Sequence, residues 1–308
     1  MRACRRKNPG FSLKTLCIWK KTDHFSCQLS KVHKDIVKDL SKMQVDTILT
    51  VYRHTGILVY RWARKKPTKK IKTNFKEEPK MCVYEMGNLR IVDLSKILDP
   101  KTESRRCHLF RFNTGGAIPD FHTNMDLMSH LGTHCECPYH HDDNWPSVAE
   151  LPLTTFLGRA VYVDFKETVA KRGHITAADL DREAGKVREG DIVIIDSSYK
   201  LYPFTPDTNT DKDQRLLVGA ESAEWFKAHK VKAVGFGDGV SIENCNEDVK
   251  PFHDILMAEN IVFLEVLRNL EQLKKDVFFM SYSPLPILGL DSSPVRAYAI
   301  EGLAEFSE

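Results

Sequence analysis

Short runs of apolar and β-branched residues recur between residues 90 and 282, and helical patterns separate several of them. Runs of this length and composition predict buried strands. We expect strands at 90–94, 159–165, 191–196, 232–236, 261–266 and 277–282. Strands that alternate with helices predict an α/β domain with a central mixed β-sheet flanked by helices.

The helical patterns carry their own start and stop signals. Thr176-Ala-Ala-Asp179 resembles a capping box with Asp in place of Glu, and it predicts the start of a helix that Gly185 or Gly190 ends. Two further helices and a short one are expected at 221–229, 251–260 and 268–274. The segment Gly235-Phe-Gly-Asp-Gly239 lacks the GxGxxG spacing and predicts a tight loop rather than a dinucleotide site.

Charge divides the chain into two parts. Residues 1–80 hold 21 basic and 6 acidic residues, a net charge of +15, whereas the remaining residues hold 24 basic and 36 acidic, a net charge of −12. We therefore predict a basic N-terminal extension at 1–80 and a folded domain at 81–308. The extension could bind nucleic acid or anionic lipid, form a solvated tail, act as an organellar presequence, or precede a native start at Met81; the last interpretation is favoured.

The cysteines and the hydropathy pattern suggest where the chain resides. Eight cysteines at irregular spacings are too few for a disulfide framework in a chain of 308 residues, so we expect a reducing, cytosolic setting. The most apolar stretch, 47–62, is interrupted by Arg53, His54, Gly56 and Arg61. It predicts no membrane span, and no secretory signal is recognised.

Metal-ligand side chains are concentrated at 130–141. The segment contains His130, His134, Glu136, His140 and His141. Imidazole and carboxylate ligands of this kind suit zinc or manganese and leave positions open for water. The alternative from the residues alone is a polar loop with surface histidines.

Backbone geometry favours the metal site. If 134–136 is extended, His134 and Glu136 share one face while Cys135 and Cys137 share the other. A sharp turn at Gly132 would bring the preceding histidine back toward the same point. With no second cysteine pair to support a CxC metal site, the two cysteines are expected to pack in the core.

The segment His130-Leu-Gly-Thr-His134-Cys-Glu136-Cys-Pro-Tyr-His140 resembles the HxGTHxDxPxH motif of the cyclase family, which includes metal-dependent kynurenine formamidases. Downstream, His253 and Glu265 are similar to that family's second pair of metal ligands, and segments 268–273 and 284–297 are also similar. The resemblance spans about 88–302 and implies the swivelling β/β/α fold of the family. For His253 alone, the residues would favour a histidine satisfied by a neighbour in its helix.

The resemblance also implies roles for these residues. One divalent cation, zinc or alternatively manganese, would be held by His130, His134 and Glu136. A second would be held by Glu136, His253 and Glu265, and His140 would transfer protons. Two departures are visible: Glu136 stands where the family has Asp, and residues 99–106 replace a Trp-Pro-Gly-Asp-like segment.

The family implies an arylformamidase, which hydrolyses N-formylkynurenine to kynurenine and formate and functions as a homodimer. An isatin or lactam hydrolase, or another cyclase of the same family, is the alternative within this class. A metal-binding protein without turnover and a nucleic-acid binder acting through 1–80 are alternatives of other classes. Tyr139, Trp145 and Phe156 could form an aromatic wall for the small aromatic substrate, or could pack the core.

Overall fold

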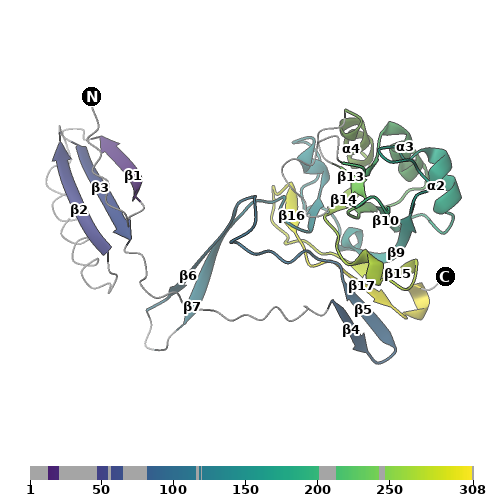
Figure 1. Ribbon diagram of the computed structural model, residues 1–308, viewed down its shortest axis with the longest axis horizontal. Helices are drawn as coiled ribbons and strands as arrows, with labels where there is room; N and C mark the ends of the chain where they lie inside the picture. The colour runs from purple at the N-terminus through teal and green to yellow at the C-terminus, as the bar shows by residue number, and fades with distance from the viewer. Residues whose placement is uncertain are drawn as a thin grey trace. The chain divides into compact units, whose positions relative to one another are not determined.

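The structure is a computed structural model that describes residues 82–115, 118, 120–200, 213–242 and 247–306, together with the backbone of three earlier strands. The chain divides into two compact units, Met1–Glu78 and Pro79–Glu308 (Figure 1). In the first unit, β1 (Leu13–Lys20), β2 (Thr47–His54) and β3 (Ile57–Arg64) form an antiparallel sheet in the order β1-β3-β2. The rest of 61–80, where basic residues are densest, lies outside the described residues, so the roles considered for the extension stay predictions.

The second unit is built on a ten-stranded mixed sheet in the order β16-β8-β14-β12-β10-β9-β15-β17-β5-β4. Its strands are β4 (Val83–Met86), β5 (Leu89–Asp93), β8 (His134–Glu136), β9 (Leu157–Asp164), β10 (Ile192–Asp196), β12 (Ala233–Phe236), β14 (Val262–Glu265), β15 (Val277–Ser281), β16 (Ser292–Pro294) and β17 (Tyr298–Glu301). The central four, β9, β10, β12 and β14, run parallel, and the strands on either side pair antiparallel. The prediction of an α/β fold with a central mixed sheet is confirmed.

Both faces of the central strands are buried, which explains their nearly continuous apolar sequences. In β10, for example, all five residues are buried, as expected for parallel strands covered on both sides. Alternate residues enter different cores: Val193 and Ile195 pack in one, and Ile192 and Ile194 in the other. The sheet is thus the middle layer between two hydrophobic cores.

The three described α-helices all contribute to the same core, and Figure 1 shows them gathered on one side of the sheet. They are α2 (Ala177–Glu183), α3 (Ala220–Ala228) and α4 (Val249–Met257). The capping box of Thr176 and Asp179 forms as predicted. The helix expected at 268–274 is only a 3-10 turn, η3 (Leu270–Gln272). Loops and 3-10 turns cover the opposite face, so the helices flank the sheet on one side.

Several remaining elements were not predicted. They are the hairpin of β6 (Cys107–Asn113) and β7 (Phe121–Leu127), the short parallel pair of β11 (Leu216–Leu217) and β13 (Val240–Ser241), and the 3-10 turns η1 (Pro138–His140), η2 (Leu153–Phe156) and η4 (Ala304–Phe306). The segment 235–239 is the expected tight loop, since it leads from β12 into β13. Among the described residues, no helix has the length and apolar character needed to cross a membrane.

Candidate metal centre

Strand β8 carries the core of the site. It lies between β14 and β16, and His134 stands opposite Glu265 of β14. His134 and Glu136 point to the helix-covered face, whereas Cys135 and Cys137 are fully buried in the opposite core with their Sγ atoms 3.9 Å apart. The predicted division of β8 into a ligand face and a cysteine face is confirmed, and both cysteines pack in the core.

The turn before β8 brings His130 back to the same place. Gly132 adopts a φ of +62°, a left-handed conformation that favours glycine. Thr133 secures the turn, because its hydroxyl donates to the carbonyl of Val266 at 2.7 Å and accepts from the amide of Lys96 at 2.7 Å. As a result, Nδ1 of His130 lies 2.5 Å from Oε1 of Glu136.

Two of the site's histidines are oriented by backbone carbonyls. Nδ1 of His134 donates to the carbonyl of Gly132, and Nδ1 of His253, on α4, donates to the carbonyl of Val249, each at 2.8 Å. Since a carbonyl can only accept, Nδ1 of each ring carries a proton, and Nε2 is the nitrogen that faces Glu136. The distance from Nε2 to a carboxylate oxygen of Glu136 is 3.2 Å for His134 and 3.6 Å for His253. Histidines that ligate metals are commonly held in this way.

Asp291 completes the support of His130, and sequence reasoning assigned it no role. Its Oδ2 lies 2.7 Å from Nε2 of His130 and 3.5 Å from Nδ1 of His140. The residue follows the loop 284–290, immediately before β16. In the sequence, Asp291 lies in a segment that resembles the family, but no other candidate ligand stands near it.

Glu136 is the point on which the three histidines converge. Burial alone would raise the pKa of its carboxyl, but hydrogen bonds from His130 and His134 outweigh that effect and hold the pKa well below its ordinary value. Oε2 is buried, and among the described residues it has no hydrogen-bond partner, since Nε2 of His253 stands 3.6 Å away, just beyond hydrogen-bond distance. An ionised, buried oxygen of this kind is costly unless a cation or donor approaches it.

The surrounding charges also fit a cation. Burial lowers the pKa values of His130 and His134, yet the carboxylates of Glu136, Asp291 and Glu265 more than compensate and raise both. In His130, His134 and Glu136, one possible ligand atom of each residue lies within 4.8 Å of those of the other two. The same holds for Glu136, His253 and Glu265. All five residues predicted as ligands are therefore brought together, and the donor set of imidazole nitrogens and carboxylate oxygens suits a divalent cation.

His140, on η1, is the most exposed histidine of this cluster. Its ring centroid is 4.4 Å from that of His130 and 6.4 Å from that of His253, and its side chain is 33% exposed. Burial, followed by the neighbouring His130 and His141, lowers its pKa against the opposing effect of Glu136. Possible ligand atoms of His140, His130 and Asp291 also lie within 4.8 Å of one another.

The expectation that His141 is a surface histidine is wrong. Its ring stacks on that of His253 at a centroid distance of 4.7 Å and an angle of 9°, and its Nδ1 donates a hydrogen bond to Oδ1 of Asp254 at 2.7 Å. Pro138 begins η1, and after this turn the ring of His140 lies beside that of His130 and the ring of His141 beside that of His253. His141 therefore supports the site and is unsuitable as a neutral control.

The predicted aromatic wall does not form from all three residues. Phe156 is buried in the sheet's second core, where its ring meets that of Tyr282 at 5.9 Å, and Trp145 packs against the helix-side core. The alternative, that these side chains pack the interior, holds for both. Tyr139 is half-buried directly before His140.

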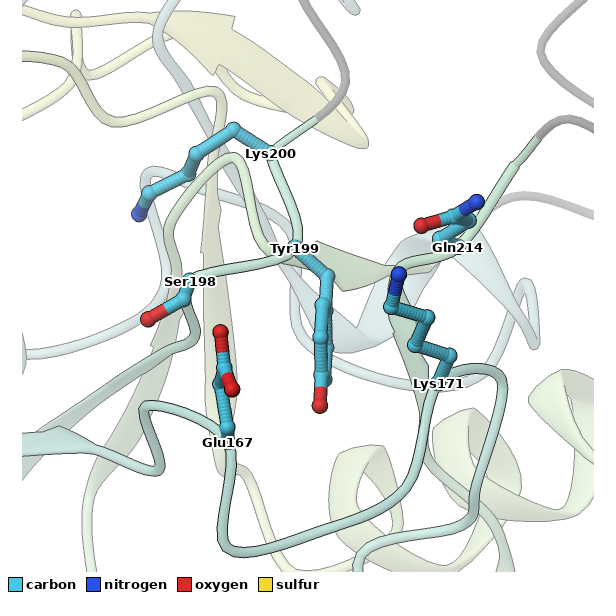
Figure 2. A pocket seen from close by; sticks show the side chains of 6 residues that line it. All are labelled: Glu167, Lys171, Ser198, Tyr199, Lys200 and Gln214. Atoms are coloured by element: carbon cyan, nitrogen blue, oxygen red, sulfur yellow. The ribbon is translucent and has the colours of Figure 1, made fainter.

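A separate polar pocket contains none of the predicted site residues (Figure 2). It is lined by Glu167, Lys171, Ser198, Tyr199, Lys200 and Gln214. Nζ of Lys171 lies 5.7 Å from the centroid of the Tyr199 ring. Its one acidic side chain and lack of histidine make it a poor metal site, so the candidate centre remains the cluster around Glu136.

The mixed sheet and the histidine and carboxylate cluster define the class of protein, an α/β fold with a candidate divalent-metal site. The chain belongs to the cyclase family, because the sequence model of the family described as "Putative cyclase" matches residues 78–244. His253 and Glu265 lie beyond that matched segment.

Curated relatives and solved structures agree with this membership. The chain is 27% identical over 168 residues to a kynurenine formamidase of Sphingopyxis alaskensis, covering 54% of this chain and 75% of the relative. It is 25% identical over 215 residues to a kynurenine formamidase of Erythrobacter litoralis, covering 68% and 92%. The fold is similar to isatin hydrolase A from Ralstonia solanacearum, with a TM-score of 0.56, 23% identity, and coverage of 70% of this chain and 92% of that one.

Proposed function

We propose that this chain is an arylformamidase that hydrolyses N-formylkynurenine to kynurenine and formate with the help of divalent cations. One observation carries the proposal: three histidines and Glu265 surround the buried, ionised Glu136, and its Oε2 has no hydrogen-bond partner among the described residues. The kynurenine formamidases found among the relatives favour this substrate.

Two groups of residues that have Glu136 in common would each hold one divalent cation. His130 and His134 would hold one ion with it, and His253 and Glu265 the other. Zinc fits the mixture of nitrogen and oxygen donors best, and manganese is the alternative. When bound, the cations polarise the substrate carbonyl and lower the pKa of the attacking water.

His140 is the proton carrier in this proposal. Its side chain is 33% exposed and its ring lies beside that of His130, so it can exchange protons with both the cluster and the solvent. It takes a proton from the attacking water and delivers it to the nitrogen as the C–N bond of the formamide breaks, so that formate and a free amine leave. Asp291, 3.5 Å from Nδ1 of His140, is a positioning residue that orients the ring.

The experiment combines metal analysis of the purified chain with a hydrolysis screen over N-formylkynurenine, isatin and a simple lactone, using chelated protein as the control. The proposal predicts bound zinc, fastest turnover of N-formylkynurenine, and loss of turnover after chelation. Preference for isatin would favour a lactam hydrolase. Bound metal with no turnover of any substrate would favour a metal-binding protein without catalysis.

Two further properties belong to this proposal. The active form is a homodimer, as the family resemblance implies, and the protein works in the cytosol. Four described cysteines, Cys82, Cys107, Cys135 and Cys137, are free, which supports a reducing setting.

A further inference from the structure

Arg105 is an exposed arginine whose guanidinium is held beside the candidate metal site. It lies in the loop between β5 and β6, and its Nη1 donates a hydrogen bond to the backbone carbonyl of His130 at 2.5 Å. The ring of the same histidine lies beside Glu136, with 2.5 Å between Nδ1 and Oε1. One residue therefore connects the arginine to the cluster of ligands.

The loop that carries Arg105 is fastened to the turn before β8. At its start, the amide of Lys96 donates to Oγ1 of Thr133 at 2.7 Å. Nζ of Lys96 also pairs with Oε2 of Glu103 at 2.9 Å, two residues before the arginine. Contacts at both ends of the loop thus hold Arg105 in place.

The charge of Arg105 has no carboxylate partner among the described residues. The acid nearest to it in the sequence, Glu103, is already paired with Lys96, and its side chain is only 8% exposed. The carbonyl of His130 is a neutral acceptor and takes one of the five N–H donors of the guanidinium. The other donors form a planar fork, which suits a carboxylate that binds through both oxygens.

The members of the cluster that adjoin His130 are also those that solvent reaches. The side chains of His140 and Asp291, which both lie next to His130, are 33% and 32% exposed. Those of His134 and His253 are almost completely buried. A substrate that enters from the exposed side therefore carries its remaining groups past His130 and the guanidinium bound to its carbonyl.

We infer that Arg105 binds the carboxylate of the substrate, so that the site prefers acidic formamides. The inference rests on the proposed function. N-Formylkynurenine has its formamide on an aromatic ring and its carboxylate at the end of the neighbouring side chain, so the group that is hydrolysed and the anion are separate. Arg105 lies in 99–106, where this chain departs from the Trp-Pro-Gly-Asp-like segment of the family, so that segment does not supply the contact.

The carboxylate keeps its charge while the C–N bond of the formamide breaks. An ion pair with it is equally strong before and during the reaction, so its loss raises KM and leaves kcat unchanged. Arg105→Gln should raise KM for N-formylkynurenine about 10- to 100-fold, because hydrogen bonds to charged groups contribute this much. Arg105→Lys keeps the charge but loses the planar fork, and should raise KM less.

The test measures kcat and KM of the full chain with its metal on N-formylkynurenine and on its carboxamide analogue, in which a neutral amide replaces the carboxylate. The parent should show a KM about 10- to 100-fold higher for the carboxamide, and Arg105→Gln should give the same KM for both substrates. The matched control is Arg106→Gln, because Arg106 is the neighbouring arginine, is 67% exposed and faces Asp126 at 3.7 Å. It should behave like the parent.

Metal content separates this role from a purely structural one. If Arg105 only held the carbonyl of His130, Arg105→Gln would lose metal and would hydrolyse both substrates equally poorly by a fall in kcat, and that result would overturn the inference. Equal KM values of the parent for the two substrates would also overturn it, whether or not a variant folds, while leaving the proposed hydrolysis intact. A parent that hydrolyses neither substrate would contradict the proposed function itself, and the inference with it.

Discussion

Glu136 shows how a single side chain determines the character of the site. Its carboxylate stays ionised although it is buried, because the imidazoles of His130, His134 and His253 surround it. Those same imidazole nitrogens are the atoms that a cation would need. Protons and metal therefore compete for one set of positions, as is usual at sites built from histidine and carboxylate.

The first prediction concerns His140, which is the most exposed histidine of the cluster. We expect His140→Ala to retain its metal and to lose a factor of about 10² to 10⁴ in turnover, the usual cost of removing an acid/base group. The measurements are metal content and the rate of hydrolysis.

Two further variants serve as controls for that result. His134→Ala removes a ligand and should lose both metal and activity. His174→Ala is the neutral control, because its side chain is exposed and pairs with Asp248 at the surface. Metal loss in His140→Ala, or parental turnover, would contradict the proton-transfer role.

The second prediction tests Asp291 as a positioning residue. Asp291→Asn keeps the shape of the side chain but removes the charge that faces His130 and His140. We expect metal affinity or turnover to fall by about 10- to 100-fold, as for other groups that orient ligands. The control is Asp276→Asn, because Asp276 is exposed and pairs with Lys186. If both variants had the same metal affinity and turnover, Asp291 would have no positioning role in the site.

Residue types and spacing indicated His130, His134 and Glu136 as candidate ligands because they lie within one short segment, whereas His253, Glu265 and the role of His140 were implied only by the resemblance to the family. Asp291 was missed because it stands 161 residues from His130 and only the folded sheet brings it near. His141 was misjudged for a related reason, since its partner Asp254 lies on α4, far along the chain. Contacts between distant segments leave no local pattern in the sequence.

At the scale of elements, the turn at Gly132 brings His130 beside Glu136 of β8. A Cβ at Gly132 would lie 2.5 Å from Cδ2 of Leu98, and the backbone φ of +62° disfavours other residues. We expect Gly132→Ala to destabilise the fold by about 1–2 kcal/mol, the usual cost of a left-handed conformation. Denaturant unfolding measures this change.

Gly185→Ala provides the matched comparison, because a Cβ there meets nothing within 4 Å and its φ is not positive. It should be neutral or slightly stabilising. Equal stability of both variants would show that Gly132 is not required for the turn.

The six predicted strands all exist within a residue or two of their expected ends, because each is an apolar run buried in the sheet. The missed strands lack that signal. β6 and β7, for example, expose most of their side chains, and hydrophobic periodicity does not detect strands of this kind. β8 has only three residues, and its extended conformation was considered only as a condition of the metal site.

At the scale of the whole molecule, the two units predict where the chain can be shortened. A chain that begins at Met81 should fold and keep full activity, since the second unit starts at Pro79 and β4 at Val83. Expression of both lengths and comparison of their turnover measure this. An insoluble or inactive short chain beside an active long one would show that the basic segment belongs to the domain.

The central claim is that Glu136 links cation binding to hydrolysis, and the most direct measurement is the metal content and turnover of Glu136→Gln in the full-length chain. A neutral amide is a weaker ligand and cannot bridge two cations as well, so we predict that metal and activity fall together. Glu136→Asp, which restores the family's shorter carboxylate, should keep measurable activity. Full metal occupancy in the Gln variant would contradict the account, because Glu136 would then lie outside the coordination sphere.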